Sequence, residues 1–309
     1  MMGRFRFARP TAFAALGILF ASAGCQRTAT PISPGPATAP APAVHPTVVS
    51  LAPSATSIVE GLGFSDHLIA VSTYDHTRGI GAQLPSAGDD VTTDWELLGK
   101  LRPDKIILQR SPDRITPGFR QRAAALGITL VDSWPLDRLS DVYARITDIG
   151  AALGEPAVAD AMNRSIRSRL DALAAKSANR PRVSVLLVAS DSDVMVAGPG
   201  TYLDDMLQAA GGVNAAPPSR DLYFTVDPEA LMTLKPDVIL LLLPGASTAA
   251  VDSARKNFLR YSNMPAVVHD RVVGMTDPDL LIPGPRVADI AESFAAILDA
   301  AAPTTEPHP

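Results

Sequence analysis

One segment of this sequence occurs twice, and the repeat constrains the fold more than any other feature. DWELLGKLRPDKIIL, residues 94–108, matches DPEALMTLKPDVILL, residues 227–241, at eight of fifteen positions with an offset of 133 residues. In both copies a run of helical character ends at a proline and an aspartate, and a short apolar run typical of a buried strand follows. A helix and a strand in the same order in each half of the chain predict two α/β units of one construction.

The rest of the chain from residue 47 alternates short apolar runs with helical stretches. Alternation of this kind predicts parallel sheets covered by helices. We therefore expect an α/β fold with one lobe over residues 47–139 and a second lobe over residues 181–302. The segments expected as strands are TVVSL, HLIAVS, DKIIL and ITLVDS in the first lobe and RVSVLLVA, DVMVAG, DVILLLL, AVVH and RVVGM in the second.

Residues 140–180 are expected to connect the lobes, mainly through one long helix. Within residues 155–179 five apolar residues recur at intervals of three or four, which is the stripe of an amphipathic helix. Pro156 favours a helix start because proline is tolerated in the first turn. At 1.5 Å per residue this helix is about 35 Å long, which predicts a stiff connection. The stripe consists of Val158, Met162, Ile166, Leu170 and Leu173.

The first 24 residues have the anatomy of an export signal. Three arginines precede the apolar run AFAALGILFASAG, which leads to Cys25. The run is shorter than the roughly 20 residues that a membrane-spanning helix needs. The segment resembles a bacterial lipoprotein signal, although Ser22 stands where leucine is usual. That resemblance implies that Cys25 is lipidated, so we expect an exported protein anchored by lipid at the periplasmic or extracytoplasmic face of a membrane.

The two ends of the folded part offer little to bury. Residues 25–46 are expected as a tether rich in proline and alanine, and residues 303–309 as a tail. A single cysteine allows no internal disulfide, so both lobes depend on their own cores. Without the three arginines of the signal the chain has 24 basic and 32 acidic residues, a net charge of about −8. This balance argues against nucleic acid or an anionic membrane surface as a partner.

Residue patterns typical of catalysis are missing from the sequence. The histidines are scattered without HExxH or other close ligand spacing, and neither a GxSxG elbow nor a Walker lysine occurs. The glycine-rich stretch 198–212 is better explained as a capped helix than as a phosphate cradle. Thr201 would be its N-cap, Asp204 would complete a capping box, and Gly211 would end it. We therefore expect a binding protein and not an enzyme.

Four motifs in order resemble the ABC-transporter substrate-binding proteins for cobalamin and iron chelates. The motifs are TVVSLAPSATSIVEGLG, the pair LRPDKIIL and LKPDVILLL on either side of TYLDDMLQAAGGVN, and finally PGPRVADIAE. The resemblance extends from residue 47 into the last helix. It implies two Rossmann-like lobes joined by a single long helix, with a ligand cleft between them. It also implies a partner, an ABC permease dimer with a cytoplasmic ATPase.

Glu96 and Glu229 occupy the same place in the two copies of the repeat. On each predicted helix the glutamate points away from the leucines that define the buried face. An acid in a first turn also complements the helix dipole, so dipole stabilisation alone is an alternative explanation. The resemblance implies that each glutamate contacts arginines of one permease subunit. We expect Glu96 and Glu229 to be docking residues, which set orientation and association rate more than affinity.

Ligand contacts are expected just past the ends of strands, where α/β lobes form their crevices. Aromatic rings suit the face of a flat ligand, and an arginine suits a carboxylate or an amide. The family motifs place two of the candidates in the cleft. They place a third near it, although a solvated turn is the stronger explanation for that residue. For the two others a position on the rim without ligand contact is an equal alternative. These candidates are, in that order, Tyr223, Arg286, Asp90, Tyr74 and Trp134. Tyr74 could also supply an axial ligand to haem.

We therefore expect a monomeric extracytoplasmic protein that captures a cobalamin-like ligand or an iron complex, such as haem or a siderophore, and delivers it to an ABC importer. It would hold no cofactor of its own, and the metal would enter as part of the cargo. One alternative is a sensor or scavenger of the same fold that meets no transporter. A further alternative is a metal-dependent enzyme that uses His76 or His269. Corrinoid, haem and siderophore receptors share the motifs, so the motifs leave the ligand open.

Overall fold

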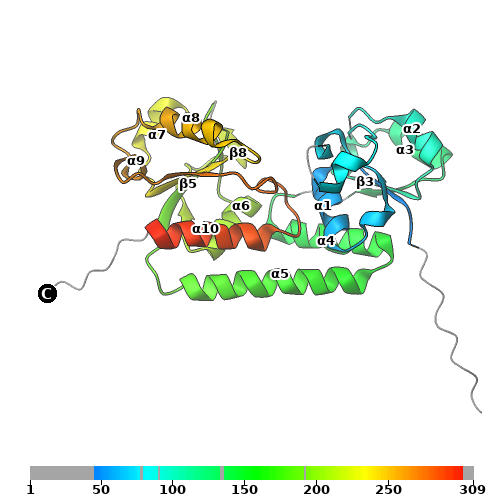
Figure 1. Cartoon of the computed structure of the whole chain (residues 1–309), viewed down its shortest axis with the longest axis horizontal. Coiled ribbons are helices and arrows are strands. Elements are labelled where there is room, and N and C mark those ends of the chain that lie inside the picture. The colour runs from blue at the N-terminus through cyan, green and yellow to red at the C-terminus, as the bar shows by residue number, and fades with distance from the viewer. Residues whose placement is uncertain (1–44, 77–78, 90, 133–135, 191–192, 302–309) are drawn as a thin grey trace, which may run out of the picture. The chain divides into compact units, whose positions relative to one another are not determined.

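Each copy of the repeated segment forms one helix and one buried strand, and the two strands belong to two different sheets (Figure 1). The first copy forms α2 (Trp95–Leu101) and β3 (Lys105–Leu108), and the second forms α7 (Pro228–Thr233) and β9 (Val238–Leu242). This computed structural model describes residues 45–76, 79–89, 91–132, 136–190 and 193–301. The prediction of one helix-strand unit per lobe is confirmed.

The first sheet has the strand order β2-β1-β3-β4, and all of its strands are parallel. β3 is central and pairs Ile106 with Val49 on one side and with Leu130 on the other. The elements around it are β1 (Val48–Ser50), α1 (Pro53–Gly61), β2 (Leu68–Ala70), α3 (Pro117–Ala125) and β4 (Thr129–Asp132). Short 3₁₀ turns lie at Ser65–His67, Thr73–Asp75, Gly79–Gln83 and Pro112–Arg114.

The second sheet repeats that order and then extends it. β7, β5, β9 and β10 are parallel neighbours in the same arrangement as β2, β1, β3 and β4. Two further strands, β6 and β8, continue the sheet in antiparallel fashion. The elements are β5 (Val183–Ser190), β6 (Met195–Ala197), α6 (Tyr202–Ala209), β7 (Gly212–Asn214), β8 (Tyr223–Thr225), α8 (Thr248–Phe258), α9 (Pro265–Val268) and β10 (Val272–Met275).

Two expectations for the second lobe need correction. The sheet is not wholly parallel, since β6 pairs antiparallel with both β5 and β8. AVVH is also not a strand, because Ala266–Val268 belong to the short helix α9 that begins at Pro265. Proline cannot donate to a strand ladder but fits the first position of a helix, which explains the outcome. Thr201 does cap α6 by accepting a hydrogen bond from the Asp204 N–H at 3.1 Å, as expected.

The aspartate after each repeated proline ties two strands together at their amino ends. Asp104 Oδ2 accepts a hydrogen bond from the Thr47 N–H at 2.8 Å, and Asp237 Oδ2 accepts one from the Ser184 N–H at 3.0 Å. In return, the Asp104 N–H donates to the Thr47 carbonyl at 3.1 Å and the Asp237 N–H to the Ser184 carbonyl at 2.8 Å. Each aspartate thus closes the start of the first strand of its lobe, which accounts for the repeated Leu-x-Pro-Asp.

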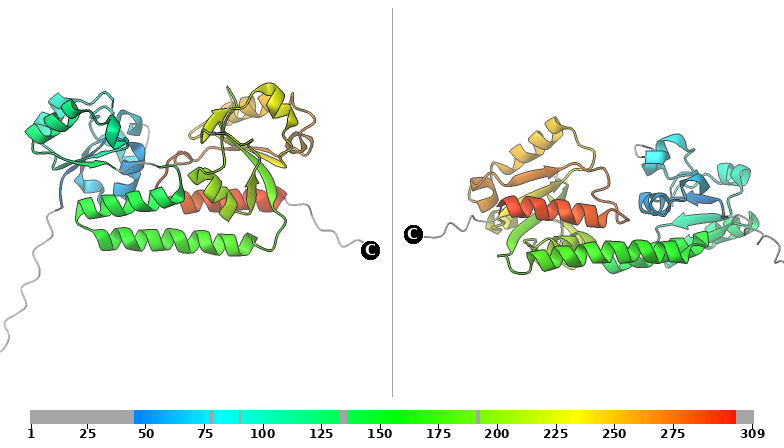
Figure 2. Two further views of the ribbon diagram at one scale, coloured as in Figure 1. Left: turned by 180° about the vertical axis from the view of Figure 1, so that it is seen from behind. Right: turned by 60° about the horizontal axis from the view of Figure 1, so that its bottom comes forward.

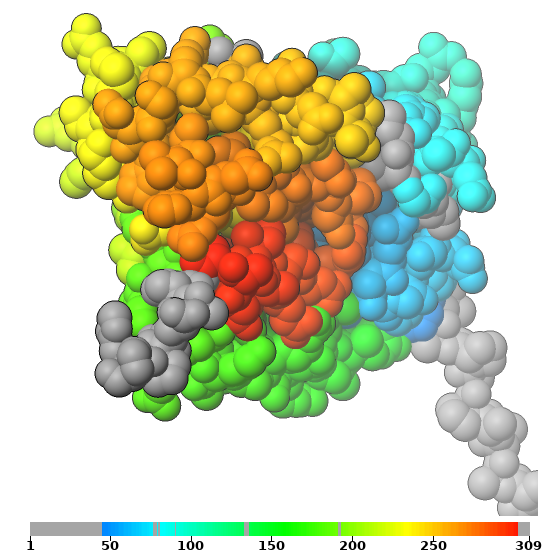
Figure 3. Space-filling view, turned by 60° about the vertical axis from the view of Figure 1, so that its left-hand side comes forward, coloured from blue at the N-terminus to red at the C-terminus, as the bar shows by residue number. Residues whose placement is uncertain are grey.

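Three long helices lie along one side of the two lobes (Figure 1). They are α4 (Leu139–Leu153), α5 (Pro156–Ser177) and α10 (Val287–Ala301), and α5 runs past both lobes. α4 and α5 pack side by side (Figure 2), and a side chain at Gly150 would collide with Ala159. α10 lies against α5 (Figure 3), where Arg169 donates to Asp289 at 2.6 Å and to Glu292 at 2.7 Å. The predicted long helix is confirmed.

The buried side chains confirm most of the predicted stripe of α5. Ile166, Leu170 and Leu173 are buried, whereas Val158 is 38% exposed. The largest apolar core combines these residues with one face of each sheet, from Val48 in the first to Val185 in the second. Among the described residues no helix has both the length and the apolar character needed to cross a membrane.

Candidate functional site

A cavity of about 380 Å³ lies where the carboxyl ends of strands from both sheets converge. In α/β folds this edge is where ligands bind, because loops and helix starts present polar groups there. Gln109 directly follows β3, and Ala189 is the last residue but one of β5. The lining residues are Gln109, Leu136, Asp137, Ala189, Met195, Tyr202, Tyr223, Leu281 and Pro283. Both lobes and the segment before α10 thus contribute to one site.

Two tyrosines are the polar side chains that the second lobe contributes to the described lining. Tyr202 is only 4% exposed, and burial raises the pKa of its phenol well above the ordinary value. Tyr223 is 39% exposed, and burial together with the carboxylate of Asp137 raises its pKa to about 12. Both phenols are therefore neutral near pH 7 and can donate hydrogen bonds.

Gln109 contributes an amide from the first lobe. The Ser54 hydroxyl, in the first turn of α1, donates to Gln109 Oε1 at 2.7 Å. This bond occupies the amide oxygen and leaves the NH₂ group of Gln109 as a donor toward a ligand. Ser54 belongs to the LAPS stretch after β1, so that motif orients a residue of the site without lining the cavity.

Asp137 is the one charged residue among those that line the cavity in the described part of the chain. The neighbouring Arg138 is not among the lining residues. Its guanidinium donates to the two Asp205 oxygens at 3.0 and 2.6 Å. That bidentate pair ties the start of α4 to α6. The cavity therefore presents neutral donors and one negative charge to whatever enters it.

The predicted ligand residues lie in different places. Tyr223 lines the cavity. Tyr74 is 63% exposed outside the lining, and its hydroxyl donates to Asp89 Oδ2 at 3.4 Å. Trp134 and Asp90 lie outside the described residues.

Arg286 is also absent from the described lining. Its guanidinium forms ion pairs with Asp277 at 2.7 Å, Asp279 at 2.8 Å and Asp289 at 3.3 Å. Hydrogen bonds to Asp277 and Asp289 raise the pKa of Arg286. The three ion pairs together fix the segment between β10 and α10. In the described structure, Arg286 therefore stabilises the chain through its three carboxylate partners.

Residues missed by sequence reasoning make up most of the lining. Tyr202 lies within the motif that predicted a capped helix, and its position directly after the N-cap was the available signal. Gln109 directly follows a predicted strand, which is the same signal that singled out Tyr74. Neither residue type is unusual at its position, so the sequence offered no reason to prefer them.

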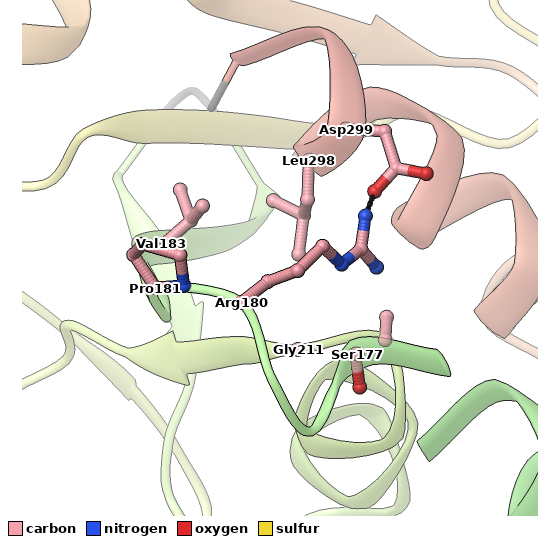
Figure 4. A pocket seen from close by; sticks show the side chains of 8 residues that line it. Ser177, Arg180, Pro181, Val183, Gly211, Leu298 and Asp299 are labelled. Carbon is pink, nitrogen blue, oxygen red and sulfur yellow. Dashed lines mark ion pairs between the residues drawn. The ribbon is translucent and has the colours of Figure 1, made fainter. Parts of the chain in front are cut away.

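Other hollows are weaker candidates. One of about 680 Å³ lies at the amino end of the second sheet, between β9, β10 and the last turns of α10, and involves one lobe only. Another, shown in Figure 4, has about 20 Å³, roughly the space of one water molecule. It is closed on one side by the Arg180–Asp299 ion pair. Within the described residues no group of three or more histidine, cysteine, aspartate or glutamate side chains could hold a metal ion.

The two glutamates of the repeat are both solvent-exposed, as expected. Glu96 is the second residue of α2, and its side chain is 81% exposed and forms an ion pair with Lys100 at 2.6 Å. Glu229 is the second residue of α7 and is also exposed, but no described residue forms an ion pair with it. Cys25 lies outside the described residues.

Comparison with known proteins identifies the family. A 27% identical relative, the vitamin B12-binding protein of Vibrio cholerae, matches over 81% of this chain and 88% of its own. The uncharacterized ABC transporter substrate-binding lipoprotein YvrC of Bacillus subtilis is 29% identical over 80% of this chain and 78% of its own. A periplasmic heme-binding protein from Pseudomonas aeruginosa superposes with a TM-score of 0.66 at 27% identity, over 86% of this chain and 96% of its own. The family model for periplasmic binding proteins matches residues 48–278, and the chain belongs to that family.

Proposed function

We propose that this chain captures a cobalamin-like corrinoid outside the cytoplasm and delivers it to an ABC importer. The observation that carries the choice of cargo is the charge of the cavity lining, in which Asp137 meets no arginine or lysine among the described lining residues. A haem brings two carboxylates, and their burial beside Asp137 without a cation is costly. A corrinoid presents neutral amides around its rim, which match the phenol of Tyr223 and the amide of Gln109.

The relatives support the same choice. The Vibrio cholerae protein is a vitamin B12-binding protein, and the Bacillus subtilis protein is a substrate-binding lipoprotein of an ABC transporter. A cavity of about 380 Å³ is at the small end of the usual range for ligand pockets, so a corrinoid would be held by one face and remain partly exposed. Cobalt would enter as cargo, and the chain would need no resident cofactor and perform no catalysis.

Haem is the second candidate, because of Tyr74. Its phenol is 63% exposed just past β2 and would exchange its hydrogen bond to Asp89 for the iron of a haem at the rim. The Pseudomonas aeruginosa neighbour is a heme-binding protein, which keeps this candidate open. A haem bound in this way would place its carboxylates away from Asp137.

Titration of the purified protein without its signal segment distinguishes the two. Cyanocobalamin, haemin and ferrichrome are added separately while the intrinsic fluorescence of the two tryptophans is recorded. We expect saturable one-to-one quenching by cyanocobalamin at concentrations at least about tenfold lower than for haemin, which corresponds to about 1.4 kcal/mol. Tight binding of haemin alone, lost in Tyr74→Phe, would replace the corrinoid by haem. Quenching by none of the three would overturn the binding function.

Delivery requires anchoring and docking, and both remain proposals for this chain. Lipidation of Cys25 would hold it to a membrane by the tether of residues 25–46. Glu96 and Glu229, one exposed on each lobe, would contact basic residues of a permease dimer that works with a cytoplasmic ATPase. In cells, Cys25→Ser should shift the protein from the membrane to the soluble fraction without altering ligand affinity. A sensor or scavenger would instead retain its role after reversal of both glutamates.

A further inference from the structure

One arginine lies beside the cavity but is held away from it. Arg138 directly follows Asp137, which lines the cavity, and is not itself among the described lining residues. Its guanidinium donates to the carboxylate of Asp205 through Nε at 3.0 Å and through Nη2 at 2.6 Å. Asp205 lies on α6, three residues after Tyr202, which also lines the cavity. Both members of this ion pair are therefore next to residues that face the ligand space.

Asp205 is well placed to hold the cation. Its side chain is only 15% exposed, and its Oδ2 atom also accepts a hydrogen bond from the Leu139 N–H at 3.0 Å. The planar fork of a guanidinium matches a carboxylate in a bidentate contact, which fixes its direction as well as adding energy. The contacts of Asp205 thus keep the positive charge of Arg138 on the α6 side of the cavity wall.

The Arg138 side chain is not built into the core. It is 52% exposed, so it would lose little packing if it moved. Consecutive Cα atoms are only about 3.8 Å apart, and an extended arginine side chain is longer than that distance. Once released from Asp205, the guanidinium can therefore swing about its own Cα toward the carboxylate of the preceding Asp137.

We propose that Asp205 is a specificity-determining residue, because it withholds the cation of Arg138 from the cavity and leaves the charge of Asp137 to face the ligand. The inference rests on the proposed function, in which the charge of the cavity favours a corrinoid. Without the Asp205 carboxylate, Arg138 would offset the charge of Asp137 and could pair with a carboxylate of haem. The ion pair thus selects a cargo with neutral amides by keeping the site unfavourable to an anionic one.

Asp205→Asn tests this role, because asparagine keeps an acceptor for the Leu139 N–H but loses the charge. The affinities for cyanocobalamin and for haemin are measured by quenching of tryptophan fluorescence in the exported chain and in the variant. We expect the preference for cyanocobalamin over haemin to fall by about tenfold, which corresponds to about 1.4 kcal/mol. An unchanged preference would overturn the proposal.

Arg138→Gln separates specificity from stability, since it breaks the same ion pair but supplies no cation. An ion pair that only stabilises the protein would weaken both ligands alike in Arg138→Gln and in Asp205→Asn. We expect Arg138→Gln to keep the parental preference within about twofold, and the double variant to restore it, because the cation that Asp205→Asn releases is then missing. A tenfold lower preference in Arg138→Gln or in the double variant would contradict the role of Asp205.

Asp270→Asn is the matched control. Arg255 Nη2 donates to Asp270 Oδ1 at 2.9 Å, and Asp270 lies just before β10, at the opposite end of the second sheet from the cavity. The variant changes the net charge by the same amount and also releases an arginine. We expect its preference to equal that of the parent chain. A shift as large as that of Asp205→Asn would show that net charge alone sets the preference, and the proposal would be rejected.

The role of Asp205 can fail independently of the proposed cargo. If the parent chain prefers haemin, the corrinoid proposal fails, but the change in preference caused by Asp205→Asn still tests the withheld cation. If neither ligand binds, a crystal structure of Asp205→Asn decides. An Arg138 guanidinium within about 4 Å of the Asp137 carboxylate, the usual limit for an ion pair, supports the inference. A guanidinium that stays at residue 205 or pairs with Asp141 overturns it.

Discussion

The two lobes share a framework and differ in what they add to it. Each has four parallel strands in the same order, and in each an aspartate closes the first strand against the repeated unit. Only the second lobe continues into β6 and β8, and these strands and α6 supply Met195, Tyr202 and Tyr223 to the cavity. The residues that the copies share build the sheet, whereas the polar side chains that line the cavity lie outside the repeated segment.

The two helices of the repeat also differ in how their acidic residues are paired. Lys100 pairs with Glu96 on α2, whereas Thr233 occupies the matching position on α7 and leaves Glu229 unpaired within the described structure. Asp94 accepts a hydrogen bond from the Leu97 N–H at 2.9 Å, whereas Asp227 forms no side-chain cap. The first helix is therefore stabilised by its own charges, and the second leaves its acids available to a partner.

The largest effect is expected on uptake. Glu96→Lys with Glu229→Lys should lower transport of the cargo by about a hundredfold or more, because like charges that face each other at an interface cost several kcal/mol. Ligand affinity should stay within about twofold. As a single change, Glu229→Lys should be the more harmful, since Lys100 already screens Glu96. Uptake assays in cells and titrations in vitro provide both measurements, and equal effects of the single changes would remove the difference between the lobes.

The next effect concerns the shared framework. Leu98 and Leu231 occupy matching positions and are both 0% exposed. Replacement of either by alanine should lower the free energy of unfolding by about 2–5 kcal/mol. Met232→Ala, on the same helix but 56% exposed, is the control and should change it by less than about 0.5 kcal/mol. Urea denaturation measures the free energy of unfolding of all three variants. An unchanged value for Leu231→Ala would mean that the second copy of the repeat does not stabilise its lobe.

The paired aspartates should have a smaller effect. Asp104→Ala and Asp237→Ala should each lower the free energy of unfolding by about 1–2 kcal/mol. The value is smaller than for a buried charged hydrogen bond because Asp104 is exposed to solvent. The N–H and hydroxyl of Thr47 lower the pKa of Asp104. Its contribution is therefore present above the ordinary carboxyl pKa and is lost as the pH falls through the lowered folded value.

The pH effect can be isolated by substitution. Denaturation midpoints between pH 7 and pH 3 should fall less steeply for Asp104→Asn than for the parent chain, because the variant has no carboxylate to protonate at this position. Parallel curves would show that the hydrogen bonds from Thr47 do not alter stability through ionisation.

The smallest effect compares the helix caps. Asp94→Ala removes a side-chain cap and should destabilise the protein by about 1 kcal/mol. Asp227→Ala removes none and should change the free energy of unfolding by less than about 0.5 kcal/mol. Thermal or urea unfolding measures the difference. An equal loss of stability in Asp227→Ala would indicate that the Asp227 side chain also stabilises α7.

The candidate site was predictable only where a motif extended into it. Tyr223 was expected because it precedes the second repeat, and it lines the cavity. Tyr202 and Gln109 were not, since nothing local distinguishes a residue that lines a cavity from one on a solvated loop. For Tyr74, Arg286 and Glu96 the structure shows positions and partners, for Glu229 it shows an exposed position, and the roles of all four stay predictions.

By itself, the sequence determined the two-unit construction, the long helix and the capped helix at Thr201. These features depend on apolar periodicity, turn residues and caps, which act over a few residues. The tertiary structure decided that β6 and β8 run antiparallel, that Asp104 and Asp237 close their strands, and that Tyr202, Tyr223, Asp137 and Gln109 share one cavity. Such contacts join residues far apart in the chain, and they form only when both sheets and the helices between them pack together.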